Sequence, residues 1–211
     1  MATTRRKPLS RERILAAALD VADEQGIDAL SMRKLGQSLG YEAMSLYNHV
    51  AKKDDVVDGI LDLVLAEIEL PDTNGGVAAI RRSALSVHEA LKRHPWAAAL
   101  LMERLRPARL EFMNSLLGAL RNAGFSAETT YHAYHVLDAH VIGFSLWQTT
   151  HGTIPADVDD VGTFVDRMVP AATFPHLHDH AMQHLEAGPH QDVPAFEYGL
   201  DLLLESLERL R

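Results

Sequence analysis

The sequence predicts an all-α protein with a small N-terminal helix-turn-helix domain and a larger C-terminal helical domain. Apolar residues recur at intervals of three and four through most of the 211 residues, and no segment is convincing as a strand. A segment with Pro and Gly at residues 71–76 interrupts this helical pattern. We therefore assign residues 1–53 to the first domain and residues 54–211 to the second, with a hinge region at residues 71–76.

A first helix is expected to follow Ser10, whose hydroxyl is suited to cap a helix N-terminus. Ile14, Ala18 and Val21 then recur at helical spacing, and Gly26 favours the end of the helix. A helix here would brace the two short helices that follow it.

The first of these short helices is bounded at both ends. Ser31 is placed to cap it, and Leu30 and Leu35 occupy the two positions of a hydrophobic staple. Leu39 continues the apolar stripe that Leu35 begins, and Gly40 supplies a residue that tolerates the left-handed conformation of a helix end.

The second short helix is expected directly after this turn. Leu46 and Val50 are four residues apart, so both can face inward. The residues that then point outward or to the flanks are Ala43, Met44, Ser45, Tyr47, Asn48 and His49. Because a helix fits the major groove of DNA, this outward face is suited to enter one.

A further helix over residues 53–68 is too apolar to face water on most sides, so it must link two cores. The remaining helical segments are expected at residues 77–93, 95–105, 107–122, 126–150, 158–169 and 194–210. The last of them carries more apolar surface than one monomer usually covers, which indicates a partner chain. Residues 152–160 and 187–194 are expected to form loops.

Composition excludes several classes of protein. No cysteine is present, so neither a disulfide framework nor a thiol nucleophile is available. No run approaches the roughly 20 apolar residues of a membrane helix, and no leader is recognisable, so we expect a soluble cytoplasmic protein.

The net charge of −9 is unevenly distributed. Residues 1–53 hold nine Lys and Arg against six Asp and Glu, whereas residues 54–211 hold eleven against twenty-three. The basic end is therefore the helix-turn-helix end, which would orient the molecule on a polyanion.

These motifs resemble the TetR family of transcriptional regulators, most densely over roughly residues 10–68. The matching segments are Met32-Arg33-Lys34-Leu35, Leu39-Gly40, Ser45-Leu46-Tyr47-Asn48-His49-Val50 and Lys52-Lys53-Asp54. Further on, residues 106–107, 124–126 and 194–202 are similar to the ligand-binding region of the tetracycline-repressor branch.

The resemblance implies a division of labour among the residues that would contact DNA. It puts Arg33, Ala43, Met44, Asn48 and His49 near base edges. The side chains expected to contact phosphates are Ser45, Tyr47 and Lys53, with Arg5, Arg6 or Lys7 as further candidates. Arg33 could pair with guanine and Asn48 with adenine, whereas Ala43 and Met44 offer only apolar contact.

A small-molecule site is expected in the second domain. His140, Phe144, Trp147 and His151 share one helix face, which either packs as core or lines a cavity. Two histidines in a core would each need a hydrogen-bond partner, and the resemblance also favours a pocket. Further lining residues implied by the resemblance are His88, Met102 and Arg106.

The chain departs from tetracycline-binding relatives, which hold a magnesium-bound drug through His and Glu. The corresponding positions here are Leu101 or Met102 and Trp147, and none of these side chains binds magnesium. We therefore expect an apolar or aromatic effector and no cofactor.

A metal site and an enzyme are both weaker interpretations. His176, His180 and His184 could line one face of a helix, but spacing alone does not make a zinc site, and we expect no metal. Asp157, Asp159 and Asp160 suggest a cation cluster, and His132 with His135 suggests acid–base chemistry. No phosphate-binding loop, Gly-x-Ser-x-Gly elbow or HExxH motif supports catalysis, so we expect no enzyme and no catalytic residues.

Taken together, the sequence predicts a homodimeric repressor released from an inverted-repeat operator in double-stranded DNA by a small hydrophobic or aromatic ligand, with no membrane partner. The alternative is an all-α module that binds small molecules or proteins and has no role on DNA.

Overall fold

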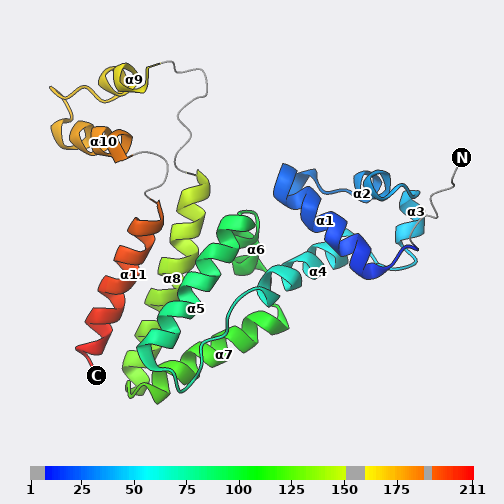
Figure 1. Ribbon diagram of the computed structural model, residues 1–211, viewed down its shortest axis with the longest axis horizontal. Coiled ribbons are helices and arrows are strands. Elements are labelled where there is room, and N and C mark those ends of the chain that lie inside the picture. Colours follow the sequence, from blue (N-terminus) through cyan, green and yellow to red (C-terminus); the bar gives the residue numbers. More distant parts are fainter. Residues whose placement is uncertain (1–7, 151–159, 188–191) are drawn as a thin grey trace, which may run out of the picture.

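The computed structural model describes residues 8–150, 160–187 and 192–211. Within these ranges the chain forms α-helices and one 3-10 turn and contains no strand, so the predicted fold class is confirmed. Figure 1 shows a group of N-terminal helices joined by one helix to a bundle formed by the later helices. No helix in the described ranges is long and apolar enough to cross a membrane.

The N-terminal unit consists of α1 (Arg11–Gln25), η1 (Ile27–Ala29), α2 (Met32–Leu39) and α3 (Ala43–Leu46). Its predicted caps are confirmed. The Ser10 hydroxyl accepts a hydrogen bond from the Arg13 amide at 3.3 Å, and the Ser31 hydroxyl accepts one from the Lys34 amide at 3.2 Å. Gly40 ends α2 in the left-handed conformation with φ of 73°, which is strained for a residue with a Cβ atom.

The second short helix is shorter than its apolar spacing suggests. Regular α3 stops at Leu46, and residues 47–49 form a turn. Leu46 nevertheless accepts hydrogen bonds from the amides of His49 and Val50, at 2.9 and 3.1 Å. Leu46 and Val50 therefore both face inward, as expected, with 0% and 3% of their surfaces exposed.

Helix α4 (Lys53–Ala66) belongs to two hydrophobic clusters. Its first half contributes Val56, Val57 and Ile60 to the core of the N-terminal unit. Its second half contributes Leu61, Val64 and Leu65 to the larger core. The predicted link between two cores is thus confirmed, while the division of the chain at residue 53 stays a prediction because α4 is shared.

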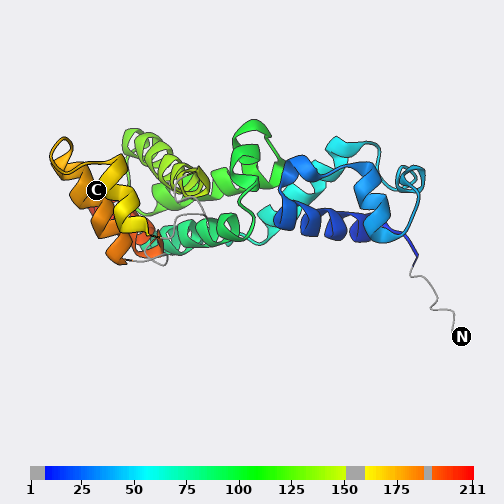
Figure 2. The same ribbon diagram turned by 90° about the horizontal axis from the view of Figure 1, so that it is seen from above.

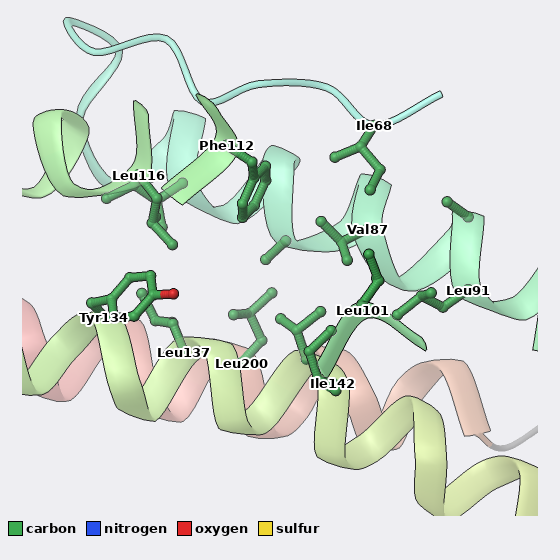
Figure 3. Close-up of a cluster of buried hydrophobic side chains, with 14 of the residues drawn as sticks. Ile68, Val87, Leu91, Leu101, Phe112, Leu116, Tyr134, Leu137, Ile142 and Leu200 are labelled. Atoms are coloured by element: carbon green, nitrogen blue, oxygen red, sulfur yellow. The ribbon is translucent and has the colours of Figure 1, made fainter. Parts of the chain in front are cut away.

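The C-terminal bundle consists of α5 (Gly76–Arg93), α6 (Ala97–Glu103), α7 (Pro107–Asn122), α8 (Ala127–Thr150) and α11 (Asp192–Glu208). Helix α8 packs against α5, α6, α7 and α11 and so forms the centre of the bundle. Figure 3 shows Phe112 and Leu116 of α7 facing Tyr134 and Leu137 of α8 across the core.

Helices α9 (Val161–Met168) and α10 (Pro175–Ala187) pack against each other at the end of the molecule remote from the N-terminal unit (Figures 1 and 2). A 2.7 Å hydrogen bond between His178 Nε2 and an Asp166 carboxylate oxygen joins them. Helix α9 lies within the helical segment expected at residues 158–169, and α10 carries the histidine-rich segment.

Candidate nucleic-acid interface and ligand cavity

The N-terminal unit presents its polar side chains to solvent on neighbouring helices. Helices α2 and α3 pack together, so Arg33 of α2 lies on the same unit as the exposed residues that follow α3. Met44 and Tyr47 expose 75% and 43% of their surfaces, and Asn48 and His49 are also exposed. Ala43 and Ser45 are half-buried, and Lys53 is exposed at the start of α4.

Gly36 sets the close approach of α2 to the start of α3. A Cβ atom at this position would lie 2.7 Å from the Tyr41 carbonyl oxygen and 3.2 Å from the Ala43 amide nitrogen. Both are backbone atoms of the turn, so they cannot swing aside, and the Tyr41 amide also donates to the Gly36 carbonyl at 2.9 Å. Gly36 was missed as a functional residue, and its signal in the sequence is a glycine inside a predicted helix.

The start of α4 is fixed to α1. An Asp55 carboxylate oxygen accepts a hydrogen bond from the Ala51 amide at 3.0 Å, and the other accepts from Arg11 at 2.8 Å. These two donors, the amide first, lower the pKa of Asp55. The connection that carries Lys53 is therefore held against α1.

A ladder of ion pairs joins α4 to the α6–α7 connection. Asp54, Asp58 and Asp62 recur every four residues and share one face of α4. Arg104 contacts Asp58 at 2.6 Å and Asp54 at 3.3 Å. Arg106 contacts Asp62 at 2.6 Å and Asp58 at 3.1 Å. The hydrogen bonds that Arg104 donates to Asp58 and Arg106 donates to Asp62 raise the pKa values of the two arginines.

Besides the ladder on α4, a contact of the α5–α6 connection joins the C-terminal bundle to α1. His94 is buried between two carboxylates, with Nδ1 2.8 Å from Asp23 and Nε2 3.3 Å from Glu67. The Trp96 indole also donates to Asp23, at 2.7 Å. Burial alone would raise the pKa of Glu67, but Arg93 and His94 outweigh it and lower the pKa. The end of α1, the end of α4 and the α5–α6 connection thus meet here.

Four of the predicted effector residues gather around Phe196 of α11. The His88 ring stacks on the Phe196 ring with 3.8 Å between the ring centroids. The His140 ring also stacks on Phe196, at a centroid distance of 4.9 Å, and the Nε2 atom of His140 donates a hydrogen bond to the Phe196 carbonyl oxygen at 3.0 Å. Phe144 meets Phe196 edge-on at 5.4 Å, and Trp147 lies 5.7 Å from Phe144 with 39% of its surface exposed. His88 Nδ1 also lies 3.4 Å from the hydroxyl of Ser145.

Phe196 was missed as a member of this group because it lies 49 to 56 residues from the stripe in α8. The remaining predicted effector residues lie elsewhere. Met102 exposes 72% of its surface on α6, and Arg106 belongs to the ladder on α4. His151 lies outside the described residues.

A small cavity lies between α5, α7 and α8. Its volume of about 20 Å³ is room for roughly one water molecule. The lining residues are Ile80, Ser83, Ala84, Val87, Arg109, Phe112, Leu116, Leu137, Asp138, Val141 and Ile142. None of the six predicted effector residues that the structure describes is among them.

One ion pair interrupts this apolar lining. Arg109 of α7 donates to Asp138 of α8, and the side chains expose 10% and 29% of their surfaces. Burial and the Asp138 charge raise the pKa of neighbouring Tyr134. The tyrosine therefore stays neutral, and Asp138 supplies the negative charge opposite Arg109.

The outer face of α8 and α11 carries an apolar groove of about 300 Å³. The lining residues are Glu128, Thr129, His132, Ala133, Val136, Leu203, Ser206, Leu207 and Leu210. Val136 and Leu210 expose 44% and 67% of their surfaces, and nearby Leu202 exposes 48%. This face agrees with the surplus of apolar surface expected on the last helix.

The residues of the weaker metal hypotheses do not come together in a site within the described ranges. His176 and His180 are exposed on α10, and the structure does not describe the side chain of His184. Over the described ranges, no group of three or more His, Asp or Glu could hold a metal ion. Asp157 and Asp159 lie outside these ranges, and Asp160 caps α9 by accepting from the Thr163 amide at 3.2 Å.

Comparisons with known proteins cover both parts of the chain. Residues 14–60 match the model of bacterial regulatory proteins of the tetR family, and residues 70–211 match the tetracyclin repressor-like C-terminal domain. The chain is 38% identical over 147 residues to an HTH-type transcriptional regulator of Saccharopolyspora erythraea, which covers 66% of this chain and 61% of that protein. That match therefore spans less than two thirds of the relative.

Two further relatives are similar over nearly the whole chain. The class D tetracycline repressor protein of Escherichia coli is 29% identical over 206 residues, covering 95% of this chain and 89% of that protein. The crystal structure of the TetR family protein ActR of Streptomyces coelicolor in complex with actinorhodin has a TM-score of 0.70 at 29% identity, covering 96% and 98% of the two chains.

Proposed function

The chain belongs to the tetR family of bacterial regulatory proteins, and from this premise we propose that it is a homodimeric transcriptional repressor, released from an inverted-repeat operator by a small hydrophobic or aromatic ligand. As such a repressor it would act in the cytoplasm, bind double-stranded DNA and catalyse no reaction.

The observation that carries this proposal is the solvent-exposed face of the helix-turn-helix. Arg33, Asn48 and His49 are exposed, whereas Leu46 and Val50 anchor the same short segment in the core. Exposed donors on a fixed backbone are what the reading of base edges requires. The excess of positive charge in residues 1–53 adds attraction to phosphates.

Dimerisation follows from the apolar groove between α8 and α11. Several of its aliphatic side chains are exposed in the single chain, and a second copy would bury them. One short recognition segment reads few bases, so two copies related by a two-fold axis would read an inverted repeat.

Response to a ligand is supported by the relative whose structure contains actinorhodin and by the cavity between α5, α7 and α8. The cavity holds only about one water molecule, so a larger ligand has to widen the space between α5, α7 and α8. The aromatic group around Phe196 is the other candidate, because it contains His88, His140, Phe144 and Trp147.

The ladder on α4 offers a route from the cavity to DNA. Arg109 lines the cavity three residues after Arg106, which contacts Asp58 and Asp62 of α4. A shift of α7 would therefore displace α4, the helix that belongs to both the N-terminal unit and the C-terminal bundle. Regulation requires that the ligand bind the DNA-incompetent arrangement more tightly than the competent one.

The test is to select genomic DNA fragments with the purified protein, footprint the retained fragment and measure the protein's mass by sedimentation. We expect a dimer and a protected site with dyad symmetry. A monomer at micromolar concentration that retains no fragment would instead support an all-α binding module without a role on DNA.

A further inference from the structure

The Arg109–Asp138 pair is the one ion pair among the residues that line the cavity, and its two members are not equally buried. The Arg109 side chain exposes 10% of its surface and contacts the Phe112 ring, at 5.7 Å from the ring centroid. The Asp138 side chain exposes 29%. The carboxylate can thus turn towards water more easily than the guanidinium can.

This asymmetry decides which ligand charge the cavity tolerates. A ligand anion that pairs with Arg109 releases Asp138 towards solvent, and neither charge is left buried alone. A ligand cation that pairs with Asp138 leaves Arg109 unpaired in an apolar site, and an unpaired buried charge is strongly unfavourable.

We propose that the cavity selects ligands with an apolar or aromatic body and one anionic group, and that this group replaces Asp138 as the partner of Arg109. The proposal rests on the proposed function only in taking this cavity as the effector site. Carboxylates suit Arg109, because they accept two parallel hydrogen bonds from a guanidinium.

The surroundings of the pair support an anion more than a neutral ligand. The rest of the lining is mainly apolar, including Phe112, Leu137 and Ile142, so it suits the body of the ligand. Tyr134 stays neutral and adds no second negative charge. The protein as a whole has a net charge of −9, which attracts cations, so a preference for anions must come from the local pair.

The experiment uses the full-length protein without DNA and three probes that share one aromatic body. Calorimetry measures the affinity of 2-naphthoate, neutral 2-naphthamide and cationic 2-naphthylmethylammonium. We expect naphthoate to bind at least about tenfold more tightly than the ammonium compound, with the amide between them.

Two substitutions locate the preference. Asp138→Asn leaves Arg109 without its carboxylate partner and should tighten naphthoate binding several-fold. Arg109→Gln should reduce naphthoate affinity to that of naphthamide. Arg82→Gln is the matched control. It removes the same positive charge as Arg109→Gln, but from a side chain of α5 that is 55% exposed and does not line the cavity. Circular dichroism verifies that each variant is folded. If Arg109→Gln does not fold, the Asp138→Asn result alone tests the proposal.

Equal or tighter binding of the cation, no measurable binding of naphthoate, or a naphthoate affinity that Asp138→Asn leaves unchanged would each overturn the proposal. Operator binding is measured separately with labelled DNA. Naphthoate that binds with the expected preference but releases no operator would count against the ligand-released repressor and leave the charge selectivity in place.

Discussion

The N-terminal unit and the C-terminal bundle build their candidate sites in opposite ways. Every residue of the predicted DNA-reading face lies between Arg33 and Lys53, on the surface of a small core. The cavity instead draws residues from α5, α7 and α8, from Ile80 to Ile142, and buries most of them. A local motif therefore reveals the first site, whereas the second exists only once distant helices pack.

The two regions also depend on different kinds of contact. In the N-terminal unit a backbone approach at Gly36 fixes the two short helices, while in the bundle large side chains such as Phe196 fill the space between helices. Substitutions should therefore damage one region and spare the other.

The largest effect is expected from Phe196→Ala. The ring is fully buried and stacks on His88 and His140, so its removal leaves a cavity and should lower the free energy of unfolding by about 3–5 kcal/mol. Urea denaturation measures this. Met102→Ala is the control, with an expected change below about 0.5 kcal/mol because Met102 is mostly exposed. Similar losses in the two variants would contradict the assignment of Phe196 to the core.

Gly36→Ala should strike the N-terminal unit instead. The added methyl group meets backbone atoms of the turn, so we expect a loss of about 1–3 kcal/mol in stability together with the loss of operator binding. Fluorescence anisotropy with labelled operator measures the binding. The same substitution at Gly162 in α9 meets only an ordinary contact with Asp160, at 3.4 Å, and should leave operator binding intact. A Gly36→Ala variant that binds operator normally would show that the turn is less tightly packed.

Within the DNA-reading face, affinity and specificity should separate. Arg33→Ala and Asn48→Ala are expected to relax base preference at a cost of about 1–3 kcal/mol each. Tyr47→Ala and Lys53→Ala should weaken binding to all sequences, and the lysine variant should also reduce the salt dependence. Binding to operator and to unrelated DNA at several salt concentrations tests this. Unchanged binding in four folded variants would make the face merely structural.

The ladder tests whether the two regions communicate. Arg106→Ala removes contacts with Asp58 and Asp62 that are partly exposed, so stability should fall by only about 1 kcal/mol or less. The ligand should nevertheless release operator less effectively, because the ion pairs between the start of α7 and α4 are lost. Release is measured by anisotropy, with Arg82→Gln as the control. A normal ligand response in Arg106→Ala would mean that coupling runs through another contact, such as His94 with Asp23.

The smallest effect is expected from acid. Arg81 lowers the pKa of Asp201, so this pair between α5 and α11 stabilises the fold above the ordinary carboxyl pKa of about 4 and is lost as pH falls through the lowered value. Asp201→Asn should therefore remove less than about 1 kcal/mol at neutral pH and make the loss of stability below pH of about 4 shallower. Denaturation at several pH values tests this. If the dependence of stability on pH below about 4 were the same in Asp201→Asn, the pair would contribute nothing measurable to the free energy of unfolding.

The sequence alone determined what depends on near neighbours. Ser10, Ser31 and Gly40 bound their helices as expected because capping and left-handed turns involve residues within four positions. The inward Leu46 and Val50 match the helical spacing of the sequence. Residues 47–49 form a turn, but the Val50 amide still donates to the Leu46 carbonyl, so the spacing of four residues is kept. The shared helix α4 was also predictable, since it is too apolar to face water on most sides.

Only the tertiary structure decided the contacts between helices far apart in the chain. The stripe in α8 indicated aromatic and histidine side chains on one face, but its partner Phe196 is brought to it by the packing of α11. Arg106 carried no sign that it would contact α4, and neither Arg109 nor Asp138 stood out as part of a cavity. Periodicity gives the face of a helix and not the identity of the helix it meets, because that choice depends on the summed packing of the whole core.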